Sequence, residues 1–453
     1  MEQRVYPLEP LFGRILSPFQ QFLRRTTAGG IVLIATALVA LALASLLGGE
    51  AWHRFWDQRL GIRFGGETRL ELSLHHWVND GLMTLFFLLV GLEIKRELLV
   101  GELSSPRAAA LPVAAALGGM VVPALVYAAF NAGTPGAPGW GIPMATDIAF
   151  AVGILVLLAW RVPKNLILFL MALAIADDLG AVLVIAVFYT PALDMGAFWS
   201  ACGLLAALAL LNRGGVRNAL PYALLGLMLW LAVLASGVHA TVAGILLAFA
   251  VPARPAQPIA RLAERMDELR ATLGNARTGK AGDDPRIAIA EGLERSAALV
   301  QSPLQRIEHA LTPWVSFAVI PVFALANAGI DLGAVAWREA LANSVTLGVM
   351  AGLVLGKFAG IGAFSWLAVR TGLARLPAGV GWRHLLGAAW LGGIGFTMSI
   401  FISQLAFVEI ERVEQAKLGI LLGSALAAAI GLLWLLAAGA GDGRRTTDAR
   451  RLQ

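Results

Sequence analysis

Two adjacent carboxylates, Asp177 and Asp178, lie inside a stretch that is otherwise apolar from Leu166 to Tyr189. A carboxylate at the centre of a membrane-spanning helix costs roughly 2.5–3.5 kcal/mol on insertion scales. We therefore expect this pair to meet a cation, a proton or a counter-charge. Since adjacent residues of an α-helix point about 100° apart, one of the two can line a cation path while the other faces a neighbouring helix.

A third carboxylate, Asp147, follows Thr146 in the sequence GIPMATDIAFAVGIL at 141–155. Gly141 and Pro143 weaken a continuous helix there and free backbone carbonyls to act as ligands, which predicts a broken helix. A simpler interpretation is that Asp147 only caps a helix start, since Thr and Asp are both good caps. Capping and ion binding are compatible.

A buried cation is expected from a later part of the chain. Lys357 lies about midway along the Gly-rich apolar stretch LVLGKFAGIGAF, with a poor route to the membrane surface. An ion pair with an aspartate is the favoured outcome. A second broken helix is predicted in GGIGFTMSIF at 392–401, which no strand or βαβ unit surrounds, so it is not a dinucleotide-binding fingerprint.

These residue types suit a hard cation such as Na⁺. Such ions prefer oxygen ligands, which carboxylates, hydroxyls and backbone carbonyls supply. Protons and Na⁺ would compete for the same carboxylates, and interacting acids titrate together. The buried aspartates are therefore candidate sites for both ions.

The composition is that of a membrane protein. Of the 453 residues, 58% are hydrophobic and only 14% are charged, and apolar stretches of about 20 residues recur along the chain. Lys and Arg are spread through the short segments between these stretches, so the excess of basic residues reflects membrane topology and not nucleic-acid binding. The single Cys202 excludes a disulfide within the chain.

We predict an all-α integral membrane protein with twelve spanning segments. These are residues 28–48, 77–98, 108–130, 141–160, 165–189, 197–212, 218–236, 238–251, 310–328, 344–368, 384–407 and 416–438. With the N-terminus in the cytoplasm, the inward side collects 27 of the 35 Lys and Arg, the outward side 7, and Lys357 lies within the membrane. The positive-inside rule therefore favours an even number of spans with both termini in the cytoplasm.

Three polar segments lie outside the predicted spans on the cytoplasmic side. They are the N-terminal segment 1–27, the mixed-charge linker 252–307, which separates spans one to eight (28–251) from spans nine to twelve (308–438), and the tail 439–453. Helical periodicity around Leu262 and Leu269 predicts one or two amphipathic helices in the linker. The tail is expected to be disordered.

A short β-hairpin is predicted in the outward segment 49–75. Apolar residues alternate on both sides of Gly65-Gly66, as in two strands joined by a tight turn, although an ordinary loop is the alternative. The exposed edge of such a hairpin can pair with a second copy of the chain. We therefore predict a periplasmic hairpin and a homodimer through residues 60–74.

Two triplets of spans carry matching interruptions, near Thr146 in the fourth span and near Thr397 in the eleventh. This pattern points to an inverted-repeat transporter with its site at the membrane midplane. Over residues 28–438, the chain also resembles the NhaA-type sodium/proton antiporters of bacterial inner membranes. The motifs that carry this resemblance are VNDGLMTLFFLLVGLEIKREL at 78–98, ATDIAFA, ALAIADDLGA, SGVHATVAG at 236–244, FALANAGI at 323–330, LGKFAGI and GGIGFTMSIFI.

The resemblance implies twelve helices in inverted-topology repeats, with crossed and discontinuous fourth and eleventh helices. It implies electrogenic exchange in which Na⁺ or Li⁺ leaves the cell while more protons enter, with no cofactor. By motif position, Asp178 is the principal ligand of cation and proton, and Asp177 pairs with Lys357 when the cation is absent. Asp147 and Thr146 support binding in the broken helix, and the transported Na⁺ would be bound by Asp178 and Asp177.

The resemblance also implies activation at alkaline pH through a charged cytoplasmic cluster. Its residues map to Glu93, Arg96, Glu97 and Glu308, with His239 at the position associated with the pH response. His239, beside Gly237 and Thr241, could equally be a hydrogen-bonded residue at a helix start. The chain departs from the family pattern in its long linker and in Gln305, where a basic residue is often found. Both departures bear on the pH threshold and not on the transport site.

Two other functional classes are weaker. A sodium-coupled symporter of an organic solute would also use crossed broken helices, but the sequence offers no cluster of groups for a solute. An intramembrane aspartyl protease is suggested by the buried aspartates and by GAGD at 439–442. That tetrapeptide follows the last apolar stretch, however, and adjacent Asp177 and Asp178 cannot form a facing dyad from separate helices. We therefore expect a secondary transporter and not an enzyme.

Overall fold

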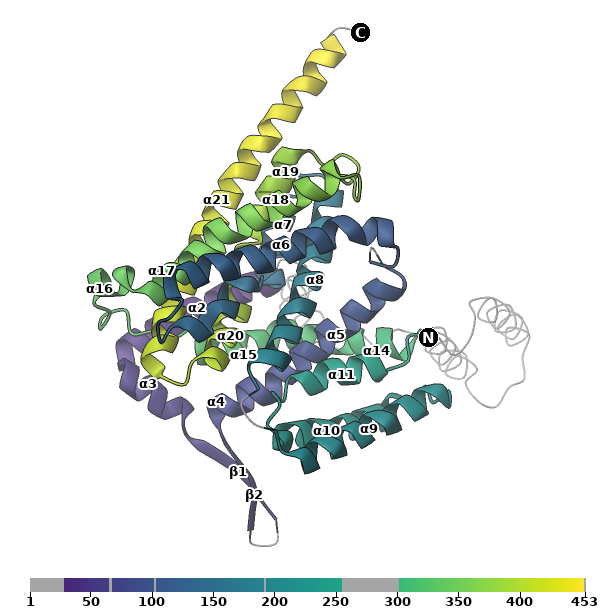
Figure 1. Cartoon of the computed structure of the whole chain (residues 1–453), viewed down its shortest axis with the longest axis vertical. Helices are drawn as coiled ribbons and strands as arrows, with labels where there is room; N and C mark the ends of the chain where they lie inside the picture. The colour runs from purple at the N-terminus through teal and green to yellow at the C-terminus, as the bar shows by residue number, and fades with distance from the viewer. Residues whose placement is uncertain (1–27, 65–66, 102, 191–192, 255–300, 452–453) are drawn as a thin grey trace, which may run out of the picture. The chain divides into compact units, whose positions relative to one another are not determined.

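The computed structural model describes residues 28–64, 67–101, 103–190, 193–254 and 301–451 (Figure 1). The predicted N-terminal segment 1–27 and most of the predicted linker lie outside these residues. The chain divides into two units, which are described separately. The first comprises Met1–Asn79, Val100–Tyr189 and Ser316–Gln453, and the second comprises Asp80–Leu99 and Thr190–Val315.

The first unit is built from helices and one pair of strands. Its first part, up to Asn79, contains α2 (Ala28–Leu47), α3 (Gly49–Trp56), β1 (Arg59–Phe64), β2 (Glu67–Ser73) and α4 (Leu74–His76). Its middle part contains α6 (Pro106–Asn131), the 3₁₀ helix η2 (Ala137–Met144), α7 (Ile148–Leu157) and α8 (Lys164–Phe188). Its last part contains α15 (Ile320–Asn327), α16 (Trp337–Ala342), α17 (Ser344–Ala351), the π-helical η4 (Gly352–Gly356), α18 (Lys357–Arg370), α19 (Trp382–Leu391), α20 (Phe396–Ala406) and α21 (Ile410–Arg451).

The second unit contains α5 (Met83–Leu99), α9 (Met195–Arg213), α10 (Ala219–Ser236), α11 (Val242–Ala250) and α14 (Pro303–Trp314). Two π-helical segments, η1 (Trp77–Leu82) and η3 (Val315–Val319), contain boundaries between the units. Glycine allows close packing within this unit. A Cβ at Gly91 of α5 would lie 2.7 Å from Cβ of Ala248 in α11, so only glycine lets these helices approach so closely.

Helices long and apolar enough to cross a membrane dominate the described residues. They number ten, or eleven when α19 and α20, whose axes differ by 47°, count as one broken span. The chain is therefore a multi-pass membrane protein. The predicted eighth span corresponds to α11, whose 9 residues reach only about half-way across a hydrocarbon core. The count of twelve spans consequently stays a prediction.

The end of the chain differs from expectation. We predicted a last span ending at residue 438 and a disordered tail after it, whereas α21 continues to Arg451. Adding residues to an existing helix needs no new nucleus, so a polar segment can prolong a long apolar helix.

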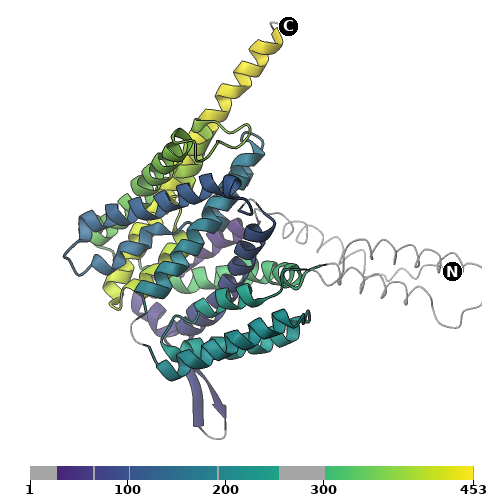
Figure 2. The same cartoon turned by 45° about the vertical axis from the view of Figure 1, so that its right-hand side comes forward.

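Small residues set the packing of α6 against α18, which lie side by side in both orientations shown (Figures 1 and 2). A Cβ at Gly118 would lie 2.6 Å from Cγ of Phe364, and one at Gly119 would lie 3.0 Å from Cγ1 of Ile361. Helices in lipid associate through close backbone packing, because burying apolar side chains provides little driving force for association there. This packing fixes the start of α18, and therefore Lys357, against α6.

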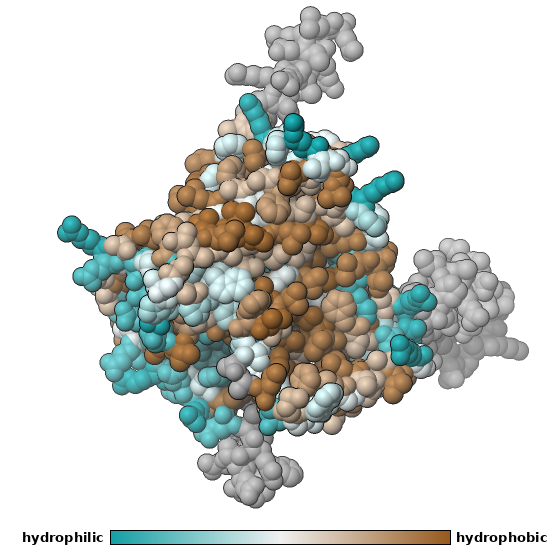
Figure 3. All heavy atoms as spheres, viewed as in Figure 1, coloured by the Kyte–Doolittle hydropathy of each residue, from teal (hydrophilic) through white to brown (hydrophobic). Residues whose placement is uncertain are grey.

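The outer surface of these helices is apolar. Figure 3 shows hydrophobic side chains gathered over α6 and α18. Among the exposed residues are Leu117, Leu125 and Trp366. Large exposed apolar areas are unusual on soluble proteins but are expected where helices face lipid.

The strands β1 and β2 form an antiparallel pair (Figure 2). Leu60 pairs with Leu72, and the register shifts between Ile62 and Arg63. Nε1 of Trp77 donates a hydrogen bond to the carbonyl of Leu60 at 3.0 Å, which ties β1 to η1. The tip, 65–66, lies outside the described residues, and the periplasmic position and dimer role of this pair stay predictions.

Candidate ion-binding site

Two helix interruptions lie in the first unit. η2 ends at Met144 and α7 begins at Ile148, while α19 ends at Leu391 and α20 begins at Phe396. Glycine lets the second break pack closely, because a Cβ at Gly393 would clash with the backbone carbonyl oxygen of Leu353. Each interruption frees backbone groups that need partners inside a membrane.

The two interruptions supply those partners to one another. The backbone N–H of Asp147 donates to the carbonyl of Ile394 at 2.7 Å. The hydroxyl of Thr146 lies 2.8 Å from the carbonyl oxygen of Gly392, and that of Ser399 donates to the carbonyl of Ile142 at 2.7 Å. Two segments about 250 residues apart in sequence are therefore joined at their breaks.

Asp147 caps two helices at once. Its Oδ1 accepts a hydrogen bond from the N–H of Phe150 at 3.0 Å, at the start of α7. Its Oδ2 accepts from the N–H and the hydroxyl of Thr397, at 3.2 Å and 2.5 Å, at the start of α20. Because helix N-termini carry partial positive charge, one buried carboxylate compensates two helix ends. Asp147 is therefore a helix cap, as the simpler interpretation expected, and it caps a second helix as well.

Lys357, Asp177 and Thr146 form a compact polar cluster. Nζ of Lys357 lies 2.5 Å from Oδ2 of Asp177 and donates to Oγ1 of Thr146 at 2.9 Å. Thr146 Oγ1 lies 2.7 Å from the same Asp177 oxygen. All three residues are fully buried. A buried ammonium or carboxylate is tolerated only when it is paired and hydrogen-bonded, as both are here.

One hydroxyl proton of Thr146 faces two acceptors, Oδ2 of Asp177 and the carbonyl of Gly392. A hydroxyl donates one hydrogen bond at a time, so this proton can serve either side. The other oxygen of Asp177, Oδ1, accepts no hydrogen bond within the described part of the chain. This carboxylate therefore retains capacity to bind a further ion or proton.

Asp178 follows Asp177 on α8 and is also fully buried. Its charge acts on Lys357 together with that of Asp177. Consecutive helix positions point apart, so Asp178 presents its oxygens in a different direction from the Lys357–Asp177 pair. Two buried acids thus lie near one buried ammonium, of which Asp177 contacts it directly.

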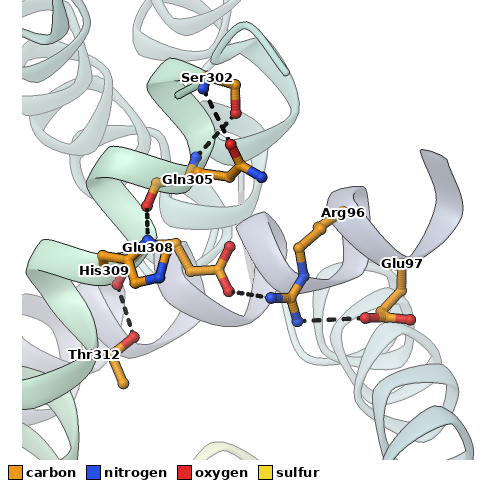
Figure 4. A network of polar contacts seen from close by, with 7 residues as sticks. All are labelled: Arg96, Glu97, Ser302, Gln305, Glu308, His309 and Thr312. Atoms are coloured by element: carbon orange, nitrogen blue, oxygen red, sulfur yellow. Dashed lines mark hydrogen bonds and ion pairs between the residues drawn. The ribbon is translucent and has the colours of Figure 1, made fainter. Parts of the chain in front are cut away.

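The predicted pH-response residues lie in the second unit. Nη1 of Arg96 in α5 lies 2.8 Å from Oε1 of Glu308 in α14, and Nη2 lies 3.3 Å from Oε1 of Glu97 (Figure 4). Glu93, one turn earlier on α5, lies within electrostatic range of Glu308 and Arg96. Arg96 therefore links α5 to α14 through a buried acid.

Two other residues of this unit were singled out from the sequence. Gln305 completes a capping box with Ser302 at the start of α14, since each side chain bonds the other's backbone N–H (Figure 4). A structural role thus accounts for Gln305. His239 lies between α10 and α11, half-buried, and its carbonyl accepts the N–H of Val242 at 3.0 Å.

Two members of the first site, Thr397 and Ser424, were not predicted from the sequence. Thr397 was noticed only as a marker of the second break, and Ser424 of α21 was not noticed at all. The hydroxyl of Ser424 accepts hydrogen bonds from the N–H groups of Gly395 and Phe396, at 3.2 Å and 3.1 Å. A lone serine in an apolar helix gives a weak signal, but Thr397 after a glycine-rich break parallels Thr146.

Buried carboxylates, a buried lysine and two joined helix interruptions in a multi-pass membrane protein define an ion-coupled secondary transporter. The chain belongs to the Na⁺/H⁺ antiporter 1 family, whose model matches residues 20–435. Members of this family are transporters rather than enzymes, and they need no cofactor.

Relatives cover nearly the whole chain. It is 61% identical to the Na⁺/H⁺ antiporter NhaA of Syntrophobacter fumaroxidans, over 95% of this chain and 92% of the relative. It is 59% identical to the NhaA antiporter of Acidithiobacillus ferrooxidans, over 93% and 97%. It is 48% identical to NhaA 1 of Saccharophagus degradans, over 94% and 93%.

Proposed function

We propose that this protein exchanges Na⁺ or Li⁺ for protons at the cluster of Asp178, Asp177, Thr146, Asp147 and Lys357. The observation that carries the assignment is the fully buried pair of Lys357 and Asp177, with Asp178 adjacent. In a membrane, such charges are retained for ion coupling far more often than for stability.

The cluster suggests how the two ions exclude one another. Without a cation, Lys357 neutralises Asp177 and Thr146 hydrogen-bonds both. A Na⁺ ion that reaches Asp178 and Asp177 displaces Lys357 from the carboxylate, and Thr146 can turn its hydroxyl proton to the carbonyl of Gly392. Protons that bind the same carboxylates release Na⁺, so one site serves both ions in turn. The exchange is electrogenic, with more protons entering than cations leaving.

The joined interruptions support the finer architecture. We assign η2 with α7 as a discontinuous fourth helix and α19 with α20 as a discontinuous eleventh helix, crossed at the site and related by an inverted repeat. α11 then serves as a short eighth helix. With this count, spans one to eight, the cytoplasmic linker and spans nine to twelve keep the predicted order, followed by a cytoplasmic tail.

Two cavities of the first unit support the assignment of loops to sides. One, of about 690 Å³, is lined from two segments predicted to be cytoplasmic, which hold Arg107 and Arg375, and from the cytoplasmic end of the predicted fifth span, at Asn165. Another, of about 830 Å³, is lined from three segments predicted to be periplasmic, including His53, Asp331 and Glu411. Each cavity gathers loops of one predicted side only. We place the protein in the bacterial inner membrane with both termini inside.

We further assign Glu93, Arg96, Glu97, Glu308 and His239 to activation at alkaline pH. The contact of Arg96 with Glu308 supports this, because it joins two helices through a buried acid. The dimer through residues 60–74 is proposed on the exposed strand pair.

A flux measurement tests the proposed exchange. Proteoliposomes with an acidic lumen should lose lumenal protons when Na⁺ or Li⁺ is added outside, with no organic solute present. A flux that requires an organic solute would favour a sodium-coupled symporter instead, and no flux with any cation would reject both.

A further inference from the structure

The cavity of about 690 Å³ in the first unit lies at the ends of three membrane helices. It is lined by the first turns of α6 and α8 and by the segment that follows α18. Nδ2 of Asn165 on α8 donates a hydrogen bond to the carbonyl of Ala378 at 2.7 Å, which closes one side of the cavity. None of the residues proposed for ion transport lines it.

The cavity carries positive charge without compensation. Arg107 and Arg375 both line it, and its described lining includes no Asp or Glu. Both arginines are solvent-accessible, and neither forms an ion pair within the part of the chain that the structure describes. Two guanidinium groups at one cavity favour a ligand with anionic oxygens, which each guanidinium can bind in a bidentate way.

Helix ends add to this charge. α6 and α8, of 26 and 25 residues, both begin at the cavity, so their positive dipole ends lie beside it. Pro163 precedes α8 and offers no side-chain cap, which leaves the first-turn N–H groups of that helix without one. The N–H of Leu166 donates to the carbonyl of Pro163 at 2.9 Å, and N–H groups at a helix start are ready donors for an anion.

The same cavity has apolar walls that open outward. Leu111 and Phe169 lie in its buried part, whereas Leu168 is 43% and Leu373 66% exposed. A free inorganic anion would gain nothing from these side chains. An amphipathic anion would, because its hydrocarbon part can cover the exposed leucines while its charged part contacts the arginines.

Aromatic residues place this region at a membrane surface. Trp160, 72% exposed, packs under the guanidinium of Arg161 at 4.4 Å shortly before α8 begins. Trp366, 52% exposed, packs in the same way with Arg370 at 5.5 Å, at the end of α18. Exposed tryptophan beside arginine is typical of the level of lipid headgroups.

From this combination we propose that the cavity binds the phosphate headgroup of an anionic phospholipid. Arg107 and Arg375 contact the phosphate oxygens, and an acyl chain runs along Leu168 and Leu373. Basic pockets between membrane helices on the cytoplasmic side are a general way of binding such lipids. This lipid site is independent of the residues proposed for Na⁺/H⁺ exchange. If the protein binds no lipid there, the proposed transport function is unaffected.

Lipid binding to the purified full-length protein tests the proposal. Delipidated protein in detergent is titrated with phosphatidylglycerol or phosphatidylcholine of matched chains, and adducts are counted by native mass spectrometry beside a thermal-unfolding measurement. Phosphatidylglycerol should bind and raise the melting temperature, and phosphatidylcholine should not. In the variant Arg107→Gln/Arg375→Gln, phosphatidylglycerol affinity should fall at least about tenfold, as expected for losing charge-assisted contacts to phosphate.

Two controls separate the alternatives. Arg254→Gln/Arg383→Gln removes the same charge from exposed positions outside the cavity and should leave phosphatidylglycerol binding unchanged. Inorganic phosphate at millimolar concentration should not raise the melting temperature. Equal lipid binding by the two double variants would overturn the proposal, as would stabilisation by inorganic phosphate equal to that by the lipid, which would indicate a site for free anions.

Discussion

At the scale of single residues, Lys357 decides the charge of the site. Its ammonium contacts Asp177 directly and acts on Asp178, so it offsets part of the negative charge of the pair. In the proposed mechanism a transported cation competes with this fixed charge. We therefore propose that Lys357 sets both how strongly the empty site holds protons and how readily it accepts Na⁺.

Replacement of Lys357 by Ala should move the pH at which exchange is half-maximal to more alkaline values by about one unit or more. Without the ammonium, the two carboxylates repel each other and release their protons only at higher pH, so Na⁺ binds later in a pH titration. Na⁺-driven proton flux in proteoliposomes, measured between pH 6.5 and 9, gives the shift.

The conservative variant Lys357→Arg keeps the charge and should shift the profile less than Lys357→Ala. An unchanged profile in Lys357→Ala would show that the contact with Asp177 has no part in proton binding.

At the scale of elements, the two broken helices depend on one carboxylate. Asp147 accepts hydrogen bonds at the starts of both α7 and α20. Each N-cap is worth about 1 kcal/mol. Loss of Asp147 should therefore loosen two elements together.

We predict that Asp147→Ala destabilises the protein by about 2 kcal/mol, roughly twice the effect of Asp194→Ala. Asp194 is a matched control because it caps only α9, through the N–H of Ala197 at 2.8 Å. Thermal unfolding in detergent, followed by intrinsic fluorescence, gives the comparison. Equal effects of the two substitutions would argue against a double cap.

The contact between α5 and α14 leads to a separate prediction, about the pH dependence of activation. Arg96 holds Glu308 beside Glu93 and Glu97, so three acids share one guanidinium. Arg96→Gln removes the positive charge that favours the ionised forms of Glu308 and Glu93, so activation should shift to more alkaline pH by up to about one unit. The maximal rate should stay near that of the wild type.

Arg306→Gln is the control for this shift, since Arg306 is an exposed arginine of α14 that makes no ion pair within the described residues. A normal pH profile for Arg96→Gln, with a full maximal rate, would remove Arg96 from the pH response.

At the scale of the whole molecule, the strand pair β1 and β2 offers a place for association. A two-stranded sheet leaves backbone groups on its edges unpaired, and a second copy can satisfy them. Deletion of 60–70 should convert a crosslinkable dimer into a monomer, as measured by crosslinking in membranes and by mass photometry. A dimer that survives the deletion would place the interface elsewhere.

Much of the site could be predicted because charged residues are rare inside membrane-spanning stretches. Charges such as Asp147, Asp177 and Lys357 are conspicuous in apolar stretches, and Gly and Pro mark both breaks. The partners could not be predicted in the same way. The bonds from Asp147 to Thr397 and from Ser424 to the start of α20 join segments far apart in sequence, and no local pattern encodes such contacts.

The fold, like the site, could be predicted from the sequence where the signal is local. Apolar length identified nearly all spans, since it is a local property of the sequence. The eighth span was harder to predict, because the helix in it, α11, has only 9 residues. The predicted span 238–251 also includes the non-helical residues before this helix. The helical extension to Arg451 was missed because polar composition alone suggested a tail.

The central claim is that Na⁺ and protons meet at Asp178. The most direct measurement is Na⁺-driven proton flux in proteoliposomes containing Asp178→Asn, beside Asp194→Asn as an exposed control. The amide keeps the size of the side chain but cannot take up a proton or carry negative charge. We predict that Asp178→Asn falls to the flux of protein-free liposomes while the control stays active, and sustained Na⁺-dependent flux in Asp178→Asn would contradict the account.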